Sequence, residues 1–464
     1  MILAPHLLIF GLCLGLAACG GPLAEKGRYP AAMPESRICS DLVRLPQDLT
    51  VYARQAGWDK SLLAPKEQDL LAERARKAFF APWRQKAPST GLKRSLADTF
   101  ALRREAGFGE NLRPFPPEDW AALKDNARPT DFPSLAAHAI TVCATSLRAM
   151  PSRRPYFLDP DLPGEGYPFD YFQHSALWAG TPLFLSHLSR DGLWVLAETS
   201  TSSGWLPLRD TALVDADFER LWQSRPLAVL VRDKVALRGR EGEEPVIGHT
   251  GALFPMAAAC GAGVAAPAIL YPRRADGGQA RPAEAVPPPG AAEPFPLPLT
   301  PEKIARVGNG MLGQPYGWGG LLENRDCSSL IRDLFLPFGL WLPRNSAGQG
   351  KAGRTEDLGG LDAPARKEYI AARAVPFFSL IWLRGHIALY LGRHQGEPVI
   401  FHTFWGLRLR GPDPQDRYGE SRAVIGKACV TGLSPGADLP DIASPNSLLD
   451  RMERLVFLSG AVSK

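Results

Sequence analysis

The apolar positions in the last third of the chain predict one amphipathic helix followed by two strands. Residues 327–335 have helical periodicity. The apolar positions that create it are Leu330, Ile331, Leu334 and Phe335. Residues 385–392 alternate between two faces instead, as a half-buried strand does, and a second strand follows at 398–406. A region that mixes helix and strand in this way, 299–464, is predicted to be an α+β domain.

The region before residue 150 has mostly helical periodicity. Segments 66–85, 116–127 and 134–150 each carry apolar residues at helical spacing, and the second opens with proline and acidic residues that suit a helix N-terminus. We therefore predict a mostly helical N-terminal domain at 39–150.

Short alternating stretches separated by turns replace this pattern in the middle of the chain. They fall into two sets, 155–214 and 218–266, and each predicts a small SH3-like β-barrel. Residues 267–298 are rich in Pro and Ala and predict an extended linker. The predicted fold class is thus multidomain α+β: a helical domain, two SH3-like barrels, a linker and the domain at 299–464.

The N-terminus has the pattern of an exported protein. An apolar run, too short for a confident membrane span, ends in a Leu-Ala-Ala-Cys junction at Cys19. This resembles a bacterial lipoprotein signal, which implies a signal peptide at 1–18, lipidation of Cys19, a tether at 19–38 and a lipid anchor in a membrane. Gly20 in place of a retention Asp implies the outer membrane of a Gram-negative bacterium and a periplasm-facing protein. A secretory signal with a coincidental cysteine is the alternative.

Composition and charge narrow the possible partners. The 464 residues are 45% hydrophobic and 22% charged, as in ordinary globular proteins, with a net charge of +5. This charge favours an anionic surface such as a cell wall but is too small for a nucleic-acid footprint, so no nucleic-acid partner is expected. No zinc-type cysteine pairs or other ligand cluster is present, so neither metal nor cofactor is expected.

Cysteine usage leaves one thiol unpaired after export. Of seven cysteines, removal of the signal deletes Cys13 and lipidation uses Cys19, which leaves an odd number. Cys39 and Cys143 flank the N-terminal domain and either pair across it or are simply small buried residues; the sequence favours neither.

Cys327 is the candidate nucleophile. It follows a Gly-rich loop and opens the predicted helix, with Asp326 at the N-cap position. Because helix N-termini stabilise anions, we expect a lowered pKa for the Cys327 thiol. His386 on the first strand is the candidate base, and His402 on the second is the candidate third residue that orients the base, with His394 as its competitor.

The motifs around these residues resemble the NlpC-type bacterial cell-wall cysteine peptidases, which have a minimal papain-like fold. The resemblance is carried by YGWGG at 316–320, DCSSL at 326–330, GHIALYLG at 385–392 and the FH at 401–402. Segments 168–199 and 204–214 resemble the bacterial SH3-like domain of one branch of that family.

That branch, as the resemblance implies, hydrolyses the γ-D-glutamyl to diamino acid (diaminopimelate) bond of peptidoglycan stem peptides whose L-alanine is unblocked. Cys327, His386 and His402 would be catalytic. Tyr316, Asp326 and Ser328 would bind the free amine of L-alanine, and the first barrel would abut the cleft. Two alternatives stand beside this hypothesis: a non-catalytic peptidoglycan-binding lipoprotein, and a papain-like muramoyl-L-alanine amidase.

Overall fold

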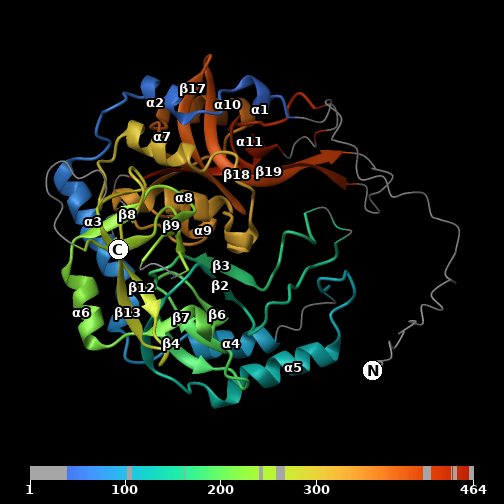
Figure 1. Cartoon of the computed structure of the whole chain (residues 1–464). Coiled ribbons are helices and arrows are strands. Elements are labelled where there is room, and N and C mark those ends of the chain that lie inside the picture. The colour runs from blue at the N-terminus through green and yellow to red at the C-terminus, as the bar shows by residue number, and fades with distance from the viewer. Residues whose placement is uncertain are drawn as a thin grey trace, which may run out of the picture. The chain divides into compact units, whose positions relative to one another are not determined.

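The computed structural model describes residues 39–101, 107–160, 162, 164–239, 244–257, 267–410, 420–439, 442 and 447–458 (Figure 1). The predicted signal peptide at 1–18, the tether at 19–38, the lipidation site Cys19 and also Cys260 lie outside these residues. Within the described ranges, every helix is too short or too polar to cross a bilayer.

The described residues between 39 and 131 form helices and short turns. They are α1 (Asp41–Arg44), α2 (Leu49–Gln55), α3 (Pro65–Phe79), η2 (Ala81–Arg84), α4 (Leu92–Ala101), α5 (Pro117–Ala127) and η3 (Pro129–Asp131). The helices predicted at 66–85 and 116–127 are confirmed as α3 and α5, and both have proline at the first turn, where the missing N–H costs nothing.

The helix predicted at 134–150 is wrong, because this segment forms two strands. Strand β1 pairs with β4 and β7, and β2 pairs with β3 and β6. The resulting seven-stranded sheet has the order β3-β2-β6-β5-β4-β1-β7. Its strands are β1 (Ala137–Thr141), β2 (Thr145–Arg148), β3 (Gln173–Leu177), β4 (Pro182–Leu188), β5 (Trp194–Glu198), β6 (Ser203–Pro207) and β7 (Thr211–Leu213). Pairing with sequence-distant strands thus overrides the local helical periodicity.

A second group of strands follows the helix α6 (Ala216–Ser224). It comprises β8 (Leu227–Leu230), β9 (Val235–Leu237), β10 (Val246–Gly248), β11 (Leu253–Pro255), β12 (Ile269–Arg274), β13 (Ala280–Ala285) and β14 (Ala292–Pro294). The linker predicted at 267–298 is therefore wrong: β12 and β13 form a hairpin, and β14 pairs with β8. Proline is compatible with these strands because each of them lies at the edge of a small sheet.

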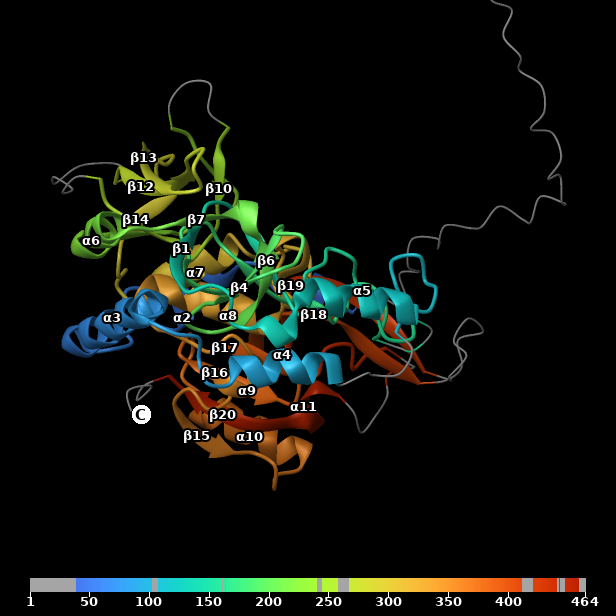
Figure 2. The same cartoon turned by 90° about the horizontal axis from the view of Figure 1, so that it is seen from below.

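The C-terminal domain has a six-stranded antiparallel sheet of order β15-β20-β16-β17-β18-β19. The strands are β15 (Arg354–Asp357), β16 (Ser379–Leu383), β17 (His386–His394), β18 (Glu397–Arg410), β19 (Glu420–Gly432) and β20 (Met452–Phe457). The helices are α7 (Pro301–Asn309), η5 (Trp318–Glu323), α8 (Cys327–Phe335), η6 (Leu336–Phe338), α9 (Ser346–Gln349), α10 (Ala363–Arg373) and α11 (Leu448–Arg451). Helix α8 packs against β17 and β18, whereas α10 and α11 lie together beside β20 (Figure 2).

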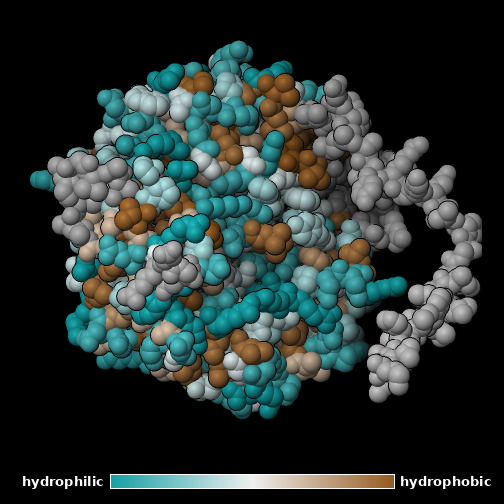
Figure 3. Space-filling view, in the orientation of Figure 1, coloured by the Kyte–Doolittle hydropathy of each residue, from teal (hydrophilic) through white to brown (hydrophobic). Residues whose placement is uncertain are grey.

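The first described residues bind the C-terminal sheet. The Gln47 side chain donates to the carbonyl of Val430 and accepts from its amide, both at 2.9 Å, so it acts as an extra partner for strand β19. Helix α2 packs on α7 and β17. Hydrophobic surface residues gather over the region of β18 and β19 in Figure 3, among largely hydrophilic surroundings.

Cys39 and Cys143, for which the sequence left a disulfide and simple burial open, do not form a disulfide. Both are free thiols, and buried Cys39 packs in one cluster with Cys429 of strand β19. Cys39 therefore fits the alternative of a small buried residue, whereas Cys143 is only partly buried.

Candidate active site

Cys327 is the first residue of helix α8. The Asp326 carboxylate accepts from the Ser329 amide at 2.8 Å, and the Ser329 hydroxyl oxygen accepts from the Asp326 amide at 2.9 Å. This reciprocal capping box fixes the start of the helix at Cys327. The thiol is 8% exposed and therefore faces a cleft rather than open solvent.

The Gly-rich loop before Cys327 packs against the first strand-rich domain. Gly319 and Gly320 have positive φ angles, +59° and +86°, which glycine adopts without strain. A Cβ on Gly319 would lie 2.4 Å from the Gln173 carbonyl oxygen, and one on Gly320 would lie 2.5 Å from the Ala176 amide. The glycine pair thus permits close contact between this loop and β3.

Cys327, His386 and His402 come together from α8, β17 and β18. The Cys327 Sγ lies 3.9 Å from the carbonyl oxygen of Gly385, the residue before His386. His386 Nε2 is 2.9 Å from His402 Nδ1. This contact leaves Nδ1 of His386 available for the thiol. His394, the competitor for the third position, packs edge-on against Tyr52 instead.

A buried threonine extends this arrangement and sets its proton positions. The Thr431 hydroxyl donates its one hydrogen to the Gly432 carbonyl at 2.8 Å, so toward His402 Nε2, at 3.1 Å, it acts as an acceptor. His402 then carries its proton on Nε2 and accepts at Nδ1 from His386 Nε2–H. Nδ1 of His386 is consequently unprotonated, as a general base for Cys327 must be.

The pKa shifts describe a neutral thiol beside a neutral imidazole. Burial, and next the Asp326 carboxylate, raise the pKa of Cys327 to about 12. Burial, and next the positive charge of Arg451, lower the pKa of His386 to about 4. The expected lowering of the Cys327 pKa is therefore wrong, because dehydration and Asp326 outweigh the helix N-terminus. Proton transfer to His386 must accompany attack by sulfur.

We expect activity to persist to unusually low pH. His386 must be unprotonated to act, and its lowered pKa keeps it neutral below its ordinary pKa of 6.5. The titratable or charged groups around His386 are Cys327, His402 and Arg451. The positive charge of Arg451 disfavours protonation of His386, and Cys327 and His402 are neutral in the resting state and so do not favour it. The acidic limb of kcat/KM against pH should lie near pH 4 to 5; a midpoint at or above pH 6.5 would contradict this assignment.

Thr431→Val is expected to lower kcat by roughly 10-fold, because one net hydrogen bond that fixes the tautomer is lost from a site of unchanged volume. Thr431→Ser, which keeps the hydroxyl, should retain near wild-type kcat. A purely structural role for Thr431 predicts equal rates for both variants, or loss of activity that follows loss of thermal stability, and either result would exclude the proton-positioning role.

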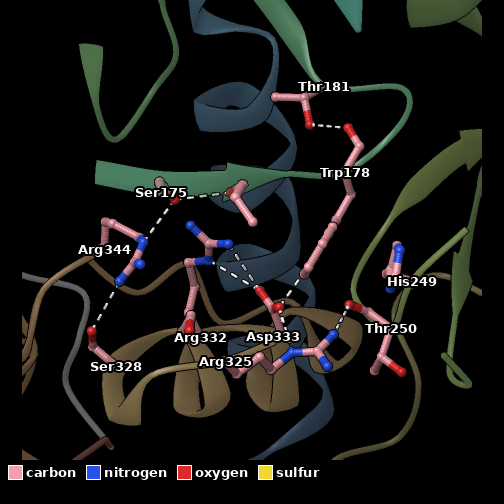
Figure 4. A network of polar contacts seen from close by, with 12 residues as sticks. Ser175, Trp178, Thr181, His249, Thr250, Arg325, Ser328, Arg332, Asp333 and Arg344 are labelled. Carbon is pink, nitrogen blue, oxygen red and sulfur yellow. Dashed lines mark hydrogen bonds and ion pairs between the residues drawn. The ribbon is translucent and has the colours of Figure 1, made fainter. Parts of the chain in front are cut away.

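The predicted substrate-binding residues do not all reach the cleft. Tyr316 lines it, and burial raises the pKa of Tyr316 well above its usual value. Asp326 and Ser328 instead face Arg344, whose Nη2 donates to Asp326 Oδ2 at 2.7 Å and whose Nη1 donates to Ser328 Oγ at 3.1 Å. Figure 4 shows Arg344 reaching from Ser175 toward Ser328.

Asp326 is fully engaged in these contacts. Oδ1 accepts from Ser328, Ser329 and Arg344, and Oδ2 accepts from the Gly319 amide and Arg344. Burial alone would raise the pKa of Asp326, but the Arg344 guanidinium lowers it below its ordinary value. The negative charge expected to attract an ammonium group is thus balanced inside the protein.

The cleft around Cys327 has a volume of about 500 Å³. Cys327, His386 and Tyr316 line it together with residues that sequence reasoning missed, namely Gly164, Phe169, Trp318, Trp405, Arg384, Arg408 and Arg451. Phe169 comes from the loop before β3 and contacts Trp318 and Tyr316, with ring centroids 5.3 and 6.2 Å apart. The first strand-rich domain therefore forms part of the wall.

Three of the missed residues have a local signal in the sequence: Trp318 lies in the YGWGG motif, Arg384 directly precedes the Gly-His of the strand motif, and Trp405 lies in the second predicted strand. Among the described residues, no group of three or more His, Cys, Asp or Glu side chains is arranged to hold a metal ion.

A cysteine at a helix start that packs on an antiparallel sheet bearing two linked histidines defines a papain-like cysteine peptidase. Residues 313–408 match the NlpC/P60 family, so the C-terminal part of the chain contains an NlpC/P60 domain. Residues 7–132 match its N-terminal stabilising domain, 155–207 an SH3 domain of SH3b1 type and 215–259 an SH3 domain of SH3b2 type.

One solved structure has the same fold over most of this chain. An NlpC/P60 endopeptidase from Photobacterium damselae subsp. piscicida superimposes with a TM-score of 0.79 at 24% identity, over 90% of this chain and 98% of that one. An NlpC/P60 family protein from Bacillus cereus ATCC 10987 has a TM-score of 0.43 at 14% identity, over 68% of this chain and 98% of that one. None of the curated proteins matches the chain.

Proposed function

We propose that the protein is a cell-wall cysteine endopeptidase that hydrolyses the γ-D-glutamyl to diaminopimelate bond of peptidoglycan stem peptides. The observation that carries this proposal is the composition of the cleft. Its described lining residues include Cys327, His386 and three arginines, and none of them is a carboxylate. Stem peptides of this kind bring several carboxylates close to the bond, and guanidinium groups complement them.

The proposed hydrolysis uses Cys327, His386 and the start of α8 in turn. His386 Nδ1 accepts the Sγ proton as Cys327 attacks the γ-carbonyl of D-glutamate. Backbone N–H groups at the start of α8, that of Cys327 included, stabilise the oxyanion. His386 then gives the proton to the departing amine, which breaks the C–N bond and leaves a thioester. Water, deprotonated by His386, attacks the thioester and releases the carboxylate and the Cys327 thiol.

A requirement for a free N-terminal L-alanine is part of the proposal. Its support is steric rather than ionic in this chain: Phe169 and Gly164 of the SH3b1 domain wall the cleft that Tyr316 also lines. A peptide still joined to glycan would need space beyond the alanine, which such a wall restricts. Asp326 and Ser328 would contribute only indirectly, through the Arg344 contacts that hold the start of α8.

Two other functions are less well supported. A non-catalytic peptidoglycan-binding lipoprotein would have no use for the aligned contacts from Thr431 to His386. A muramoyl-L-alanine amidase would have to admit a blocked alanine, against the Phe169 wall.

We also propose that the protein is an outer-membrane lipoprotein facing the periplasm, anchored through Cys19. The Leu-Ala-Ala-Cys junction and Gly20 support this localisation. Incorporation of labelled fatty acid that is lost in Cys19→Ala tests it; equal labelling of both proteins would refute it.

Mass spectrometry of the products tests the activity. Wild-type protein should release L-Ala-D-Glu from L-Ala-γ-D-Glu-diaminopimelate and leave the N-acetylmuramoyl form intact. Equal cleavage of both would remove the free-alanine requirement but keep the bond choice. Release of muramic acid from the second peptide would support the amidase instead, and no cleavage of either would favour the binding protein.

A further inference from the structure

Two arginines lie next to each other in the cleft, close to the catalytic histidine. Arg384 occupies the turn between β16 and β17, two residues before His386, and Arg451 is the last residue of α11. Arg451 Nη2 donates to the Arg384 carbonyl oxygen at 3.3 Å, which joins the two segments. Both side chains are exposed, and neither forms an ion pair with a carboxylate of the described chain.

The position of this pair identifies the part of the substrate that it faces. His386 passes a proton to the leaving amine, so the groups beside His386 lie on the leaving-group side of the scissile bond. Only Gly385 separates Arg384 from His386 in the sequence, both arginines line the cleft with His386, and the Arg451 charge helps to lower the pKa of His386. The pair therefore flanks the residue whose amine departs.

We propose that Arg384 and Arg451 form a subsite for a free carboxylate of the leaving-group residue. This inference rests on the proposed endopeptidase function and adds which group the enzyme recognises on the far side of the bond. A planar guanidinium binds a carboxylate through two parallel hydrogen bonds, and two arginines that line one cleft without a counter-charge among the described residues favour an anionic ligand. A diaminopimelate residue with free carboxylates supplies that ligand.

Binding would also affect the catalytic base. A carboxylate seated beside Arg451 offsets the positive charge that disfavours protonation of His386, and so it eases the transfer of the thiol proton to His386. Occupation of the subsite should consequently raise kcat as well as lower KM.

The test compares two peptides and four proteins, to which the double variant with Arg384→Gln and Arg451→Gln is added. The peptides are L-Ala-γ-D-Glu-diaminopimelate and its analogue with both diaminopimelate carboxylates converted to amides. The proteins are wild type, Arg451→Gln, Arg451→Lys and Lys351→Gln, in which the last removes a positive charge from an exposed residue of the same domain that does not line the cleft.

We expect wild type and Lys351→Gln to prefer the free carboxylates by about 10-fold or more in kcat/KM. Arg451→Gln should lose most of this preference through slower cleavage of the free acid, and Arg451→Lys should keep part of it. Adding Arg384→Gln to Arg451→Gln should abolish it.

Three outcomes overturn the inference. If wild type cleaves both peptides equally, or if Arg451→Gln with Arg384→Gln keeps the full preference, the subsite is wrong while the endopeptidase function stands. If wild type cleaves neither peptide, the proposed function fails and the subsite fails with it. Circular dichroism of each variant distinguishes a lost preference from a lost fold, since both arginines are exposed and neither substitution should alter the spectrum.

Discussion

Cys327→Ala should abolish peptide hydrolysis, with a fall in kcat of roughly 10⁴-fold or more. The other side-chain nucleophiles at the start of α8, the Ser328 and Ser329 hydroxyls, are held by Asp326 and Arg344. Cys327 is the one thiol among the described residues that line the cleft, where the other hydroxyls are those of Tyr316 and Ser447. His386→Ala should cause a loss of similar size, and the double variant should be no worse than either single one, because the two residues act as a unit.

Cys429→Ala is the matched control for this experiment. Cys429 is also a buried thiol, 1% exposed, and burial likewise raises its pKa to about 12, but it lies on β19 in a hydrophobic cluster. Its replacement should leave kcat within a few-fold of wild type. If Cys327→Ala keeps more than a small fraction of the activity, water or another residue attacks the substrate, and the covalent mechanism is wrong.

The parts of the fold that the sequence predicts well are those with a strong local period. Helix α8 and strands β17 and β18 carry their burial pattern within a few residues, so both histidines and Cys327 could be placed from the sequence alone. The segment at 134–150 also has an apolar period, but its strands exist because β1 pairs with Leu183 and Leu185 of β4, about 45 residues away.

The sequence predicts which residues form the catalytic group better than it predicts their pKa values and polar partners. A helix N-terminus favours a thiolate, yet the raised pKa of Cys327 depends on how completely the thiol is buried and on the Asp326 charge beside it. Arg344, whose guanidinium forms the ion pair with Asp326, lies 18 residues further along the chain. Phe169 and Arg451 line the cleft and Thr431 contacts His402 behind it; the three residues are far apart in the sequence, and only the folded chain brings them to one site.

Arg325→Met should lower the free energy of unfolding by about 3 to 5 kcal/mol, the usual cost of stranding buried carboxylates. Arg325 is 2% exposed and lies directly before Asp326. Its guanidinium donates to both oxygens of Asp233, at 2.6 and 2.9 Å, and to Asp333 at 2.8 Å. It therefore ties the SH3b2 domain to helix α8, as the dashed contacts around Arg325, Thr250 and Asp333 in Figure 4 show for part of this network.

The measurement is urea unfolding of wild type and variants, with Arg190→Met as the control. Arg190 pairs with Asp125 on the surface, where both side chains are more than half exposed, so its loss should cost less than about 1 kcal/mol. Adding Asp233→Asn to Arg325→Met should recover part of the stability, because it removes the buried charge that Arg325 leaves without a guanidinium, whereas Asp333 keeps its ion pair with Arg332. A loss for Arg325→Met no larger than that for Arg190→Met would mean that water replaces the guanidinium, and that the SH3b2 domain is held to the peptidase domain by apolar packing instead.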